Sequence, residues 1–267
     1  MIVINDRGRG FEKELRSLCA DSPFGARIEA YYSAYKSNIY SFLDFWLCRS
    51  SNNKAVCALC RYYDTLIFCG ECSEEVKSFI EMLSPRNVLC DNASGLSLPG
   101  YLAKTGETMR CIAPKALQDY LPNGFEIVLL NGEMDDLREV YTLLLNEYSD
   151  GASLGCFNDY FIDMSHRIRH KVTDVYTVRF EGRIVSTLAA VALSQTAAVI
   201  GSVATDSRFR RRGIAGYLVS KVTNDLCRSG KTIFLHRERY IGIYERAGYE
   251  VTGKVLELRK SGEDNAL

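Results

Sequence analysis

The segment VATDSRFRRRGIAGYL, residues 203–218, decides how the rest of the chain can be interpreted. Its pattern predicts a strand that ends near residue 205, then a short basic loop, then a helix. Arg210, Gly213 and Ala215 fit the pattern R-x-x-G-x-[GA]. Backbone N–H groups in the first turn of a helix have no intrahelical partner, and the helix dipole adds about half a positive charge there. The segment therefore predicts a site for an anion such as a pyrophosphate.

The residues around this predicted site suit a phosphate group. Gly213 has no side chain and Ala215 a small one, so a phosphate could approach the backbone closely. Four arginines surround the loop: Arg208, Arg210, Arg211 and Arg212. The segment contains neither G-x-x-x-x-G-K-[ST] nor G-x-G-x-x-G, so it is not one of the common nucleotide-binding loops. The alternative is a solvated basic loop before an ordinary helix.

A second motif lies closer to the C-terminus. The segment IYERAGY, residues 243–249, fits Y-x-x-x-G-[FY], and the sequence between the two motifs predicts a helix and a strand. In this order the two motifs resemble the GNAT superfamily of acetyl-CoA-dependent N-acetyltransferases, over about residues 125–259. The resemblance implies an α/β (α+β) fold, in which helices flank a mixed, mostly antiparallel central sheet.

The resemblance also implies which residues bind the co-substrate acetyl-CoA. Backbone amides from Arg210 to Gly216 would hold the CoA pyrophosphate, with arginine side chains assisting. A splayed strand would pair with the pantetheine arm, and one of its amides would polarise the thioester carbonyl. The implied set is Val203, Ala204, Thr205, Arg210, Arg211, Arg212, Gly213, Ile214, Ala215 and Gly216.

One catalytic residue is implied in the same way. Tyr244 matches the tyrosine that protonates the departing CoA thiolate in many GNAT members, a step that needs an acid because the thiolate leaves as the amine attacks. The alternative is a tyrosine that merely packs in its helix. Acetyl transfer in the family is direct, so neither Cys156 nor Cys227 is expected to act as a nucleophile.

The chain departs from the family pattern at two places. Arg211 stands where a glycine is usual, which crowds the loop but adds charge. The family often has an asparagine near the start of the last helix, whereas this chain reads HRERYIG there. The general base is not identified: His236, Glu238 or a water relay would serve. The resemblance places three acidic residues beside the acceptor groove, where a solvated helix face is the alternative: Glu147, Asp150 and Asp159.

The 267 residues are enough for two domains, and we expect residues 1–122 and 123–267 to form them. Residues 91–124 are rich in loop signals and would contain the junction. Residues 1–45 have a helical pattern, and the strand and helix order after them repeats that of the second half. We therefore interpret the front half as a degenerate GNAT-like domain. Its segment FCGECSEEVKS is acidic where a CoA loop would be basic, so this domain lacks a CoA site.

The front half contains VCALCRYYDTLIFCGEC, residues 56–72, with two C-x-x-C pairs. Such pairs can form a zinc site. The composition also fits a β-hairpin, in which residues three apart point to opposite faces and cannot converge on one metal. We favour the hairpin and expect no metal. Ten cysteines without a secretory signal are typical of a reducing compartment, so we expect a cytoplasmic protein with free thiols.

The remaining features limit the partners. Lys+Arg and Asp+Glu both number 33, which argues against a nucleic-acid partner. Residues 186–204 are weakly polar, but a central Ser-Gln-Thr favours two buried strands joined by a tight turn over a membrane span. We expect an N-acetyltransferase that acts on a small-molecule or peptide amine, as a monomer or dimer. The alternatives are a non-catalytic acyl-CoA sensor and a zinc-bearing interaction module.

Overall fold

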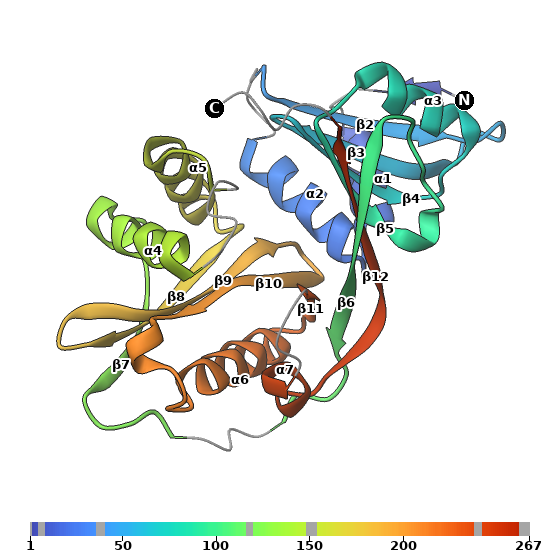
Figure 1. Ribbon diagram of the computed structural model, residues 1–267. Helices are drawn as coiled ribbons and strands as arrows, with labels where there is room; N and C mark the ends of the chain where they lie inside the picture. The colour runs from blue at the N-terminus through green and yellow to red at the C-terminus, as the bar shows by residue number, and fades with distance from the viewer. Residues whose placement is uncertain are drawn as a thin grey trace. The chain divides into compact units, whose positions relative to one another are not determined.

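The computed structural model describes residues 2–4, 9–35, 41–115, 120–147, 154–237 and 242–261 (Figure 1). The chain forms two compact units, one of Met1–Thr108 with Val251–Leu267 and the other of Met109–Glu250. The sequence prediction placed the junction between residues 122 and 123 and the whole C-terminus in the second domain. The units differ from it because their boundaries fall inside two long strands, β6 (Tyr101–Cys111) and β12 (Tyr249–Lys260).

The N-terminal unit has the strand order β1-β2-β3-β4-β5-β12. Only the pair β4–β5 is parallel among these neighbours. Its strands are β1 (Ile2–Ile4), β2 (Leu43–Arg49), β3 (Ala55–Tyr62), β4 (Thr65–Gly70) and β5 (Asn87–Asp91). Its helices are α1 (Arg9–Cys19), α2 (Pro23–Tyr35), α3 (Glu74–Leu83) and the short 3-10 helix η1 (Asn92–Ser94).

The second unit has the strand order β6-β11-β10-β9-β8-β7. Strands β7 to β10 are antiparallel neighbours, and β10 pairs with β11 in parallel. Figure 1 shows α4 and α5 on one face of this sheet and α6 and α7 on the other. The strands are β7 (Phe125–Leu129), β8 (Asp174–Phe180), β9 (Arg183–Leu193), β10 (Ala197–Thr205) and β11 (Thr232–Arg237). The helices are α4 (Met134–Glu147), α5 (Phe157–Arg169), η3 (Ser207–Phe209), α6 (Ile214–Arg228) and α7 (Gly242–Arg246).

This arrangement confirms the predicted fold class, a mixed and mostly antiparallel sheet flanked by helices. The weakly polar stretch from residue 186 to residue 204 forms most of β9 and β10, joined by a short turn as predicted. None of the helices that the structure describes is long and apolar enough to cross a membrane.

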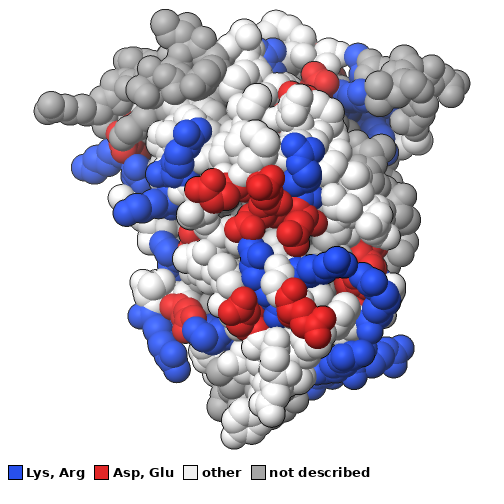
Figure 2. Space-filling model, turned by 90° about the vertical axis from the view of Figure 1, so that its left-hand side faces the viewer, with Lys and Arg blue, Asp and Glu red and all other residues white. Residues whose placement is uncertain are grey.

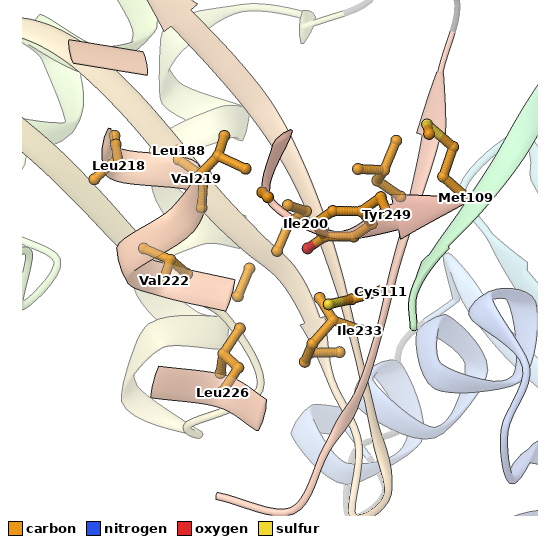
Figure 3. Close-up of a cluster of buried hydrophobic side chains, with 14 of the residues drawn as sticks. Met109, Cys111, Leu188, Ile200, Leu218, Val219, Val222, Leu226, Ile233 and Tyr249 are labelled. Carbon is orange, nitrogen blue, oxygen red and sulfur yellow. The ribbon is translucent and has the colours of Figure 1, made fainter. Parts of the chain in front are cut away.

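Helix α6 anchors the second unit through one apolar face. Ile214, Leu218, Val222 and Leu226 form this face and are all buried. Figure 3 shows side chains of α6 turned toward side chains of the sheet, among them those of Leu188, Ile200 and Ile233. Burial of such a side chain stabilises the fold by roughly 1.5–3 kcal/mol. The position and direction of α6 are therefore fixed along its whole length.

Helix α4 lies on the opposite face of that sheet. Leu137, Val140, Leu143 and Leu144 are buried there. The neighbouring Leu145 is 38 % exposed. The reason is geometric: each residue turns the helix by about 100°, so residue 145 passes beyond the edge of a stripe centred on 140 and 144.

Two predictions for the front half were wrong. Residues 1–45 are not helical throughout, because Ile2–Ile4 pairs with β2 and β2 itself begins at Leu43. Residues 91–124 are not mainly loop, because they contain the long strand β6. Residues 102–105 of that strand are all exposed, so it lacks the alternation of apolar and polar residues by which a strand is recognised.

Cys57 and Cys60 lie in β3 and Cys69 lies in β4, the two strands of the hairpin that the sequence predicted, whereas Cys72 follows the end of β4. Cys57 packs in the cluster that contains α3, together with Cys72. Cys60 lies on the other face, near Cys19 of α1, and Cys69 donates toward the Leu18 carbonyl of that helix at 3.8 Å. Each pair is thus divided between the two faces of the sheet. The described residues contain no group of three or more potential metal ligands.

Metal analysis tests this arrangement. We expect protein purified without chelators to contain well below one zinc per chain, because neither C-x-x-C pair can place both sulfurs on one ion. A structural site would instead hold about one zinc per chain. Titration of thiols in denaturant serves as the control that the cysteines are reduced. A zinc content close to stoichiometric would contradict the assignment of the hairpin as scaffold.

Gly248, in the second sequence motif, has a structural reason to be glycine. Its φ is +96°, and a Cβ built on it would lie 1.9 Å from the carbonyl oxygen of Ala113. Its own carbonyl accepts a hydrogen bond from the Ile112 N–H at 3.0 Å. The residues that follow β6 therefore pass directly against the turn between α7 and β12.

We expect Gly248→Ala to lower the free energy of unfolding by at least about 3 kcal/mol, because backbone strain and a steric clash add together. Gly182→Ala is the matched control. Gly182 also has a positive φ, +79°, but nothing lies within 4 Å of the added Cβ, so about 1–2 kcal/mol is expected. Urea unfolding measures both values. Equal losses would show that the close approach to Ala113 does not matter.

Candidate functional site

The candidate site begins where β10 and β11 part. Their parallel register runs from Ala197–Thr232 to Ile200–Leu235, although β10 continues to Thr205. The pairing of β10 with β9 shifts register between Gly201 and Ala204, which marks a bulge. Ser202 has a positive φ of +51° in that bulge. The sequence predicted a splayed strand at Val203, Ala204 and Thr205, and these residues occupy the diverging end of β10.

Buried hydroxyl groups fasten the end of β10 to β9. The Ser186 hydroxyl donates to the Ala204 carbonyl at 2.9 Å and shares a hydrogen bond of 2.8 Å with the Thr205 hydroxyl. Ser186 is fully buried. Sequence reasoning did not single out Ser186, because a serine within a weakly polar strand gives no signal of its partner across the sheet.

The loop after β10 leads directly into the N-terminus of α6. Gly213 is the residue before the helix, with a φ of +77° that favours glycine. The first intrahelical bond runs from the Tyr217 N–H to the Gly213 carbonyl at 2.9 Å. The N–H groups of Ile214, Ala215 and Gly216 therefore precede the helical ladder and point out of the helix end. This is the geometry that binds anions at helix N-termini.

Arg211, at the position where the resemblance leads us to expect glycine, is in the left-handed region with a φ of +63°. An L-residue there costs roughly 1–2 kcal/mol. The backbone thus keeps a conformation suited to glycine although the side chain is arginine. In return the loop gains an exposed cation beside the helix end.

The four arginines of the loop divide into two pairs. Arg208 bonds to Asp206 at 2.6 Å, and this hydrogen bond lowers the pKa of the Asp206 carboxyl. Arg210 pairs with Glu147 and donates from Nε to the Thr205 carbonyl at 3.1 Å. Arg211 and Arg212 have no acidic partner in the part of the chain that the structure describes. Among the four loop arginines, and with respect to the described residues, these two offer an uncompensated positive charge to a bound anion.

Arg212 also has a defined position. Its guanidinium lies 5.2 Å from the centre of the Phe209 ring, within the range of a cation–π contact. It also lies 3.4 Å from the Arg208 carbonyl. The ring of Phe209 packs in turn on Phe125 and Phe180, so the hydrophobic core supports the basic loop.

Of the three acidic residues that the resemblance placed beside an acceptor groove, two have hydrogen-bond partners within the chain. Glu147, the last residue of α4, contacts the loop: its carboxylate accepts the Ser207 N–H at 3.0 Å and pairs with Arg210. Asp159 is exposed in the first turn of α5 and accepts from the Cys156 thiol at 3.1 Å. Asp150 lies outside the described residues.

Tyr244 lies on α7, which packs against α6. Its side chain is half-buried, and its ring meets that of Tyr249 edge-on, with centroids 6.2 Å apart. Tyr249 is itself buried, and its hydroxyl shares a hydrogen bond of 2.8 Å with Thr223 of α6. The two sequence motifs are thus joined through α6. His236 is half-buried near the end of β11, and Glu238 lies outside the described residues.

The family comparison agrees with this geometry. The family model described as FR47-like protein matches residues 180–257. This range contains every residue that the sequence placed in the cofactor and catalytic set. A search of curated proteins found no match.

Several solved structures share the fold. A GCN5-related N-acetyltransferase from Sphaerobacter thermophilus is 18 % identical, with a TM-score of 0.59 over 97 % of this chain and 95 % of that one. One from Kribbella flavida is 14 % identical, with a TM-score of 0.56 over 78 % and 88 %. A tandem GNAT protein from the clavulanic acid biosynthesis pathway is 11 % identical, with a TM-score of 0.58 over 99 % of both chains.

These likenesses are too remote to carry more than the fold, but two of them extend along nearly the whole chain, while the family match lies in its C-terminal part. Residues 180–257 are accordingly similar to FR47-like protein, in a chain whose overall fold is shared with these N-acetyltransferase structures.

Proposed function

We propose that the protein is an N-acetyltransferase that moves the acetyl group of acetyl-CoA directly to a primary amine. The observation that carries the proposal is the N-terminus of α6, whose first amides point outward beside two arginines that have no acidic partner among the described residues, at the diverging end of β10. A pyrophosphate would accept from the amides of residues 214–216, while Arg211 and Arg212 neutralise its charge.

The proposed reaction uses a backbone amide at the end of β10 and the hydroxyl group of Tyr244. The amine nitrogen forms a bond to the thioester carbonyl carbon, and the carbon–sulfur bond breaks. A backbone amide of Val203, Ala204 or Thr205 would stabilise the oxyanion in between. Tyr244 would give its hydroxyl proton to the departing thiolate, and the proton lost by the amine would restore the tyrosine through solvent. No covalent enzyme intermediate is required.

A non-catalytic acyl-CoA sensor is the second candidate, and one contact favours it. The ring of Tyr244 packs against Tyr249, which is the placement expected of a tyrosine that merely stabilises its helix. Such a protein would use the same loop for binding but would have no turnover. An experiment on Tyr244, and not one on the loop, therefore distinguishes an N-acetyltransferase from an acyl-CoA sensor.

One face of the molecule bears on the choice between a nucleic-acid partner and an amine acceptor. Figure 2 shows the side of the molecule that faces left in Figure 1, where acidic side chains gather near the middle and basic ones lie around them. On that face the drawn residues do not form the continuous basic surface that phosphate backbones require. We therefore propose an amine of a small molecule or peptide as the acceptor.

The arginines of the loop provide the first test. We expect Arg211→Ala with Arg212→Ala to weaken acetyl-CoA binding by roughly tenfold or more, because both cations lack a carboxylate partner. Arg208→Ala removes one charge from the same loop but only frees Asp206, so a smaller effect is expected. Calorimetric titration measures the three dissociation constants. Equal weakening by both variants would contradict the division into two pairs.

Tyr244 provides the second test. We expect Tyr244→Phe to lower kcat about a hundredfold with little change in the affinity for acetyl-CoA, because the ring packing is kept and only the acid is lost. The assay follows release of free CoA with a panel of amines. Tyr176→Phe, on β8, is the matched control for loss of a hydroxyl. Unchanged turnover in Tyr244→Phe would remove Tyr244 from the mechanism.

A further inference from the structure

Helix α4 ends on the loop that leads into α6, and a single carboxylate makes the contact. Glu147 accepts the Ser207 N–H through one oxygen at 3.0 Å and pairs with Arg210 through the other. Ser207 begins the short helix η3 and Arg210 follows it. One side chain therefore holds both ends of η3, the first part of the connection between β10 and α6.

Arg210 extends this contact back to the strand. Its Nε donates to the Thr205 carbonyl at 3.1 Å, while its terminal nitrogen meets Glu147. Thr205 in turn shares a hydrogen bond with the buried Ser186 of β9. Two of the three guanidinium nitrogens of Arg210 are thus engaged by the protein itself.

The environment of Glu147 shows that this contact is not incidental. Its side chain is only 12 % exposed, and a carboxylate at low exposure needs partners for its charge. It also stands at the C-terminal end of α4, where the helix dipole disfavours a negative charge. The Ser207 N–H and the Arg210 guanidinium offset both costs, so the three groups stabilise one another.

We infer that Glu147 is a positioning residue of the acetyl-CoA loop, which it holds in the turn that presents the α6 amides, and that Arg210 serves this turn instead of binding the pyrophosphate. The inference rests on the proposed function for its link to acetyl-CoA. The loop-holding role itself concerns only contacts within the chain.

Amide exchange in the ligand-free protein tests the loop-holding role. We expect the Ser207 amide to exchange about tenfold faster or more in Glu147→Ala than in wild type, because its acceptor is gone. Glu147→Gln keeps an oxygen that can accept this bond and should restore most of the protection. Asp135→Asn, which removes an exposed carboxylate from the first turn of α4, should change nothing at Ser207. Unchanged exchange in Glu147→Ala would overturn the inference.

The affinity for acetyl-CoA tests whether Glu147 and Arg210 shape the binding site. For Glu147, the sign of the change in affinity distinguishes a positioning role from a simple charge effect. Removal of a negative charge near an anion site should strengthen anion binding if only Coulomb attraction matters. For Glu147→Ala we expect the opposite, a binding about tenfold weaker, and Arg210→Ala should weaken binding by about the same factor. The double variant should bind no more weakly than either single one, because the pair acts as a unit.

The outcomes separate this inference from the proposed function. Wild type that fails to bind acetyl-CoA would overturn the proposed function, while the exchange data would still decide the role of Glu147. Wild type and Glu147→Ala that bind equally well would overturn the inference alone. A double variant weakened by the product of both single effects would mean that Arg210 contacts the phosphates itself. Circular dichroism checks the fold, and Glu147→Gln replaces Glu147→Ala if the latter does not fold.

Discussion

The packing of α6 on the sheet is the constraint on which the candidate site depends. An anion site made of backbone amides works only if the helix end is held still, since the amides have no side chains with which to adjust. The buried face from Ile214 to Leu226 supplies that rigidity along the helix. Strand β10 fixes the other side of the loop, because its end is bonded to β9 through Ser186 and Thr205. The loop is thus held between two elements that belong to one core.

The elements of this site could be predicted because their signals are local. A strand, a glycine with a positive φ and an amphipathic helix follow one another within residues 197–228, and each leaves its own pattern in the sequence. The contact of Glu147 could not be predicted in the same way. Its partner Ser207 is 60 residues away, and a glutamate at the end of a helix is equally typical of a solvated surface. The resemblance placed Glu147 beside an acceptor groove. Its contact with the loop is visible only in the three-dimensional structure.

The four arginines illustrate a related limit. From the sequence they form one basic cluster, and all of them are plausible ligands of a phosphate. The structure pairs Arg208 and Arg210 with Asp206 and Glu147, which leaves Arg211 and Arg212 as the available charges. The sequence gives only the number of basic residues, whereas the charge that a bound anion meets depends on which carboxylates the fold places beside them. A count of basic residues therefore overstates what the loop offers to an anion.

The two strands that cross between the units explain why the domain prediction differed from the structure. Residues Val255 to Arg259 of β12 pair with β5 and so complete the N-terminal sheet. Met109 and Cys111 of β6 are buried in the core around α6 and so complete the second one. Each half of the chain thus gives a strand to the compact unit of the other half. A boundary near residue 122, drawn where loop signals gather, would separate Met109 and Cys111 from the core that they fill.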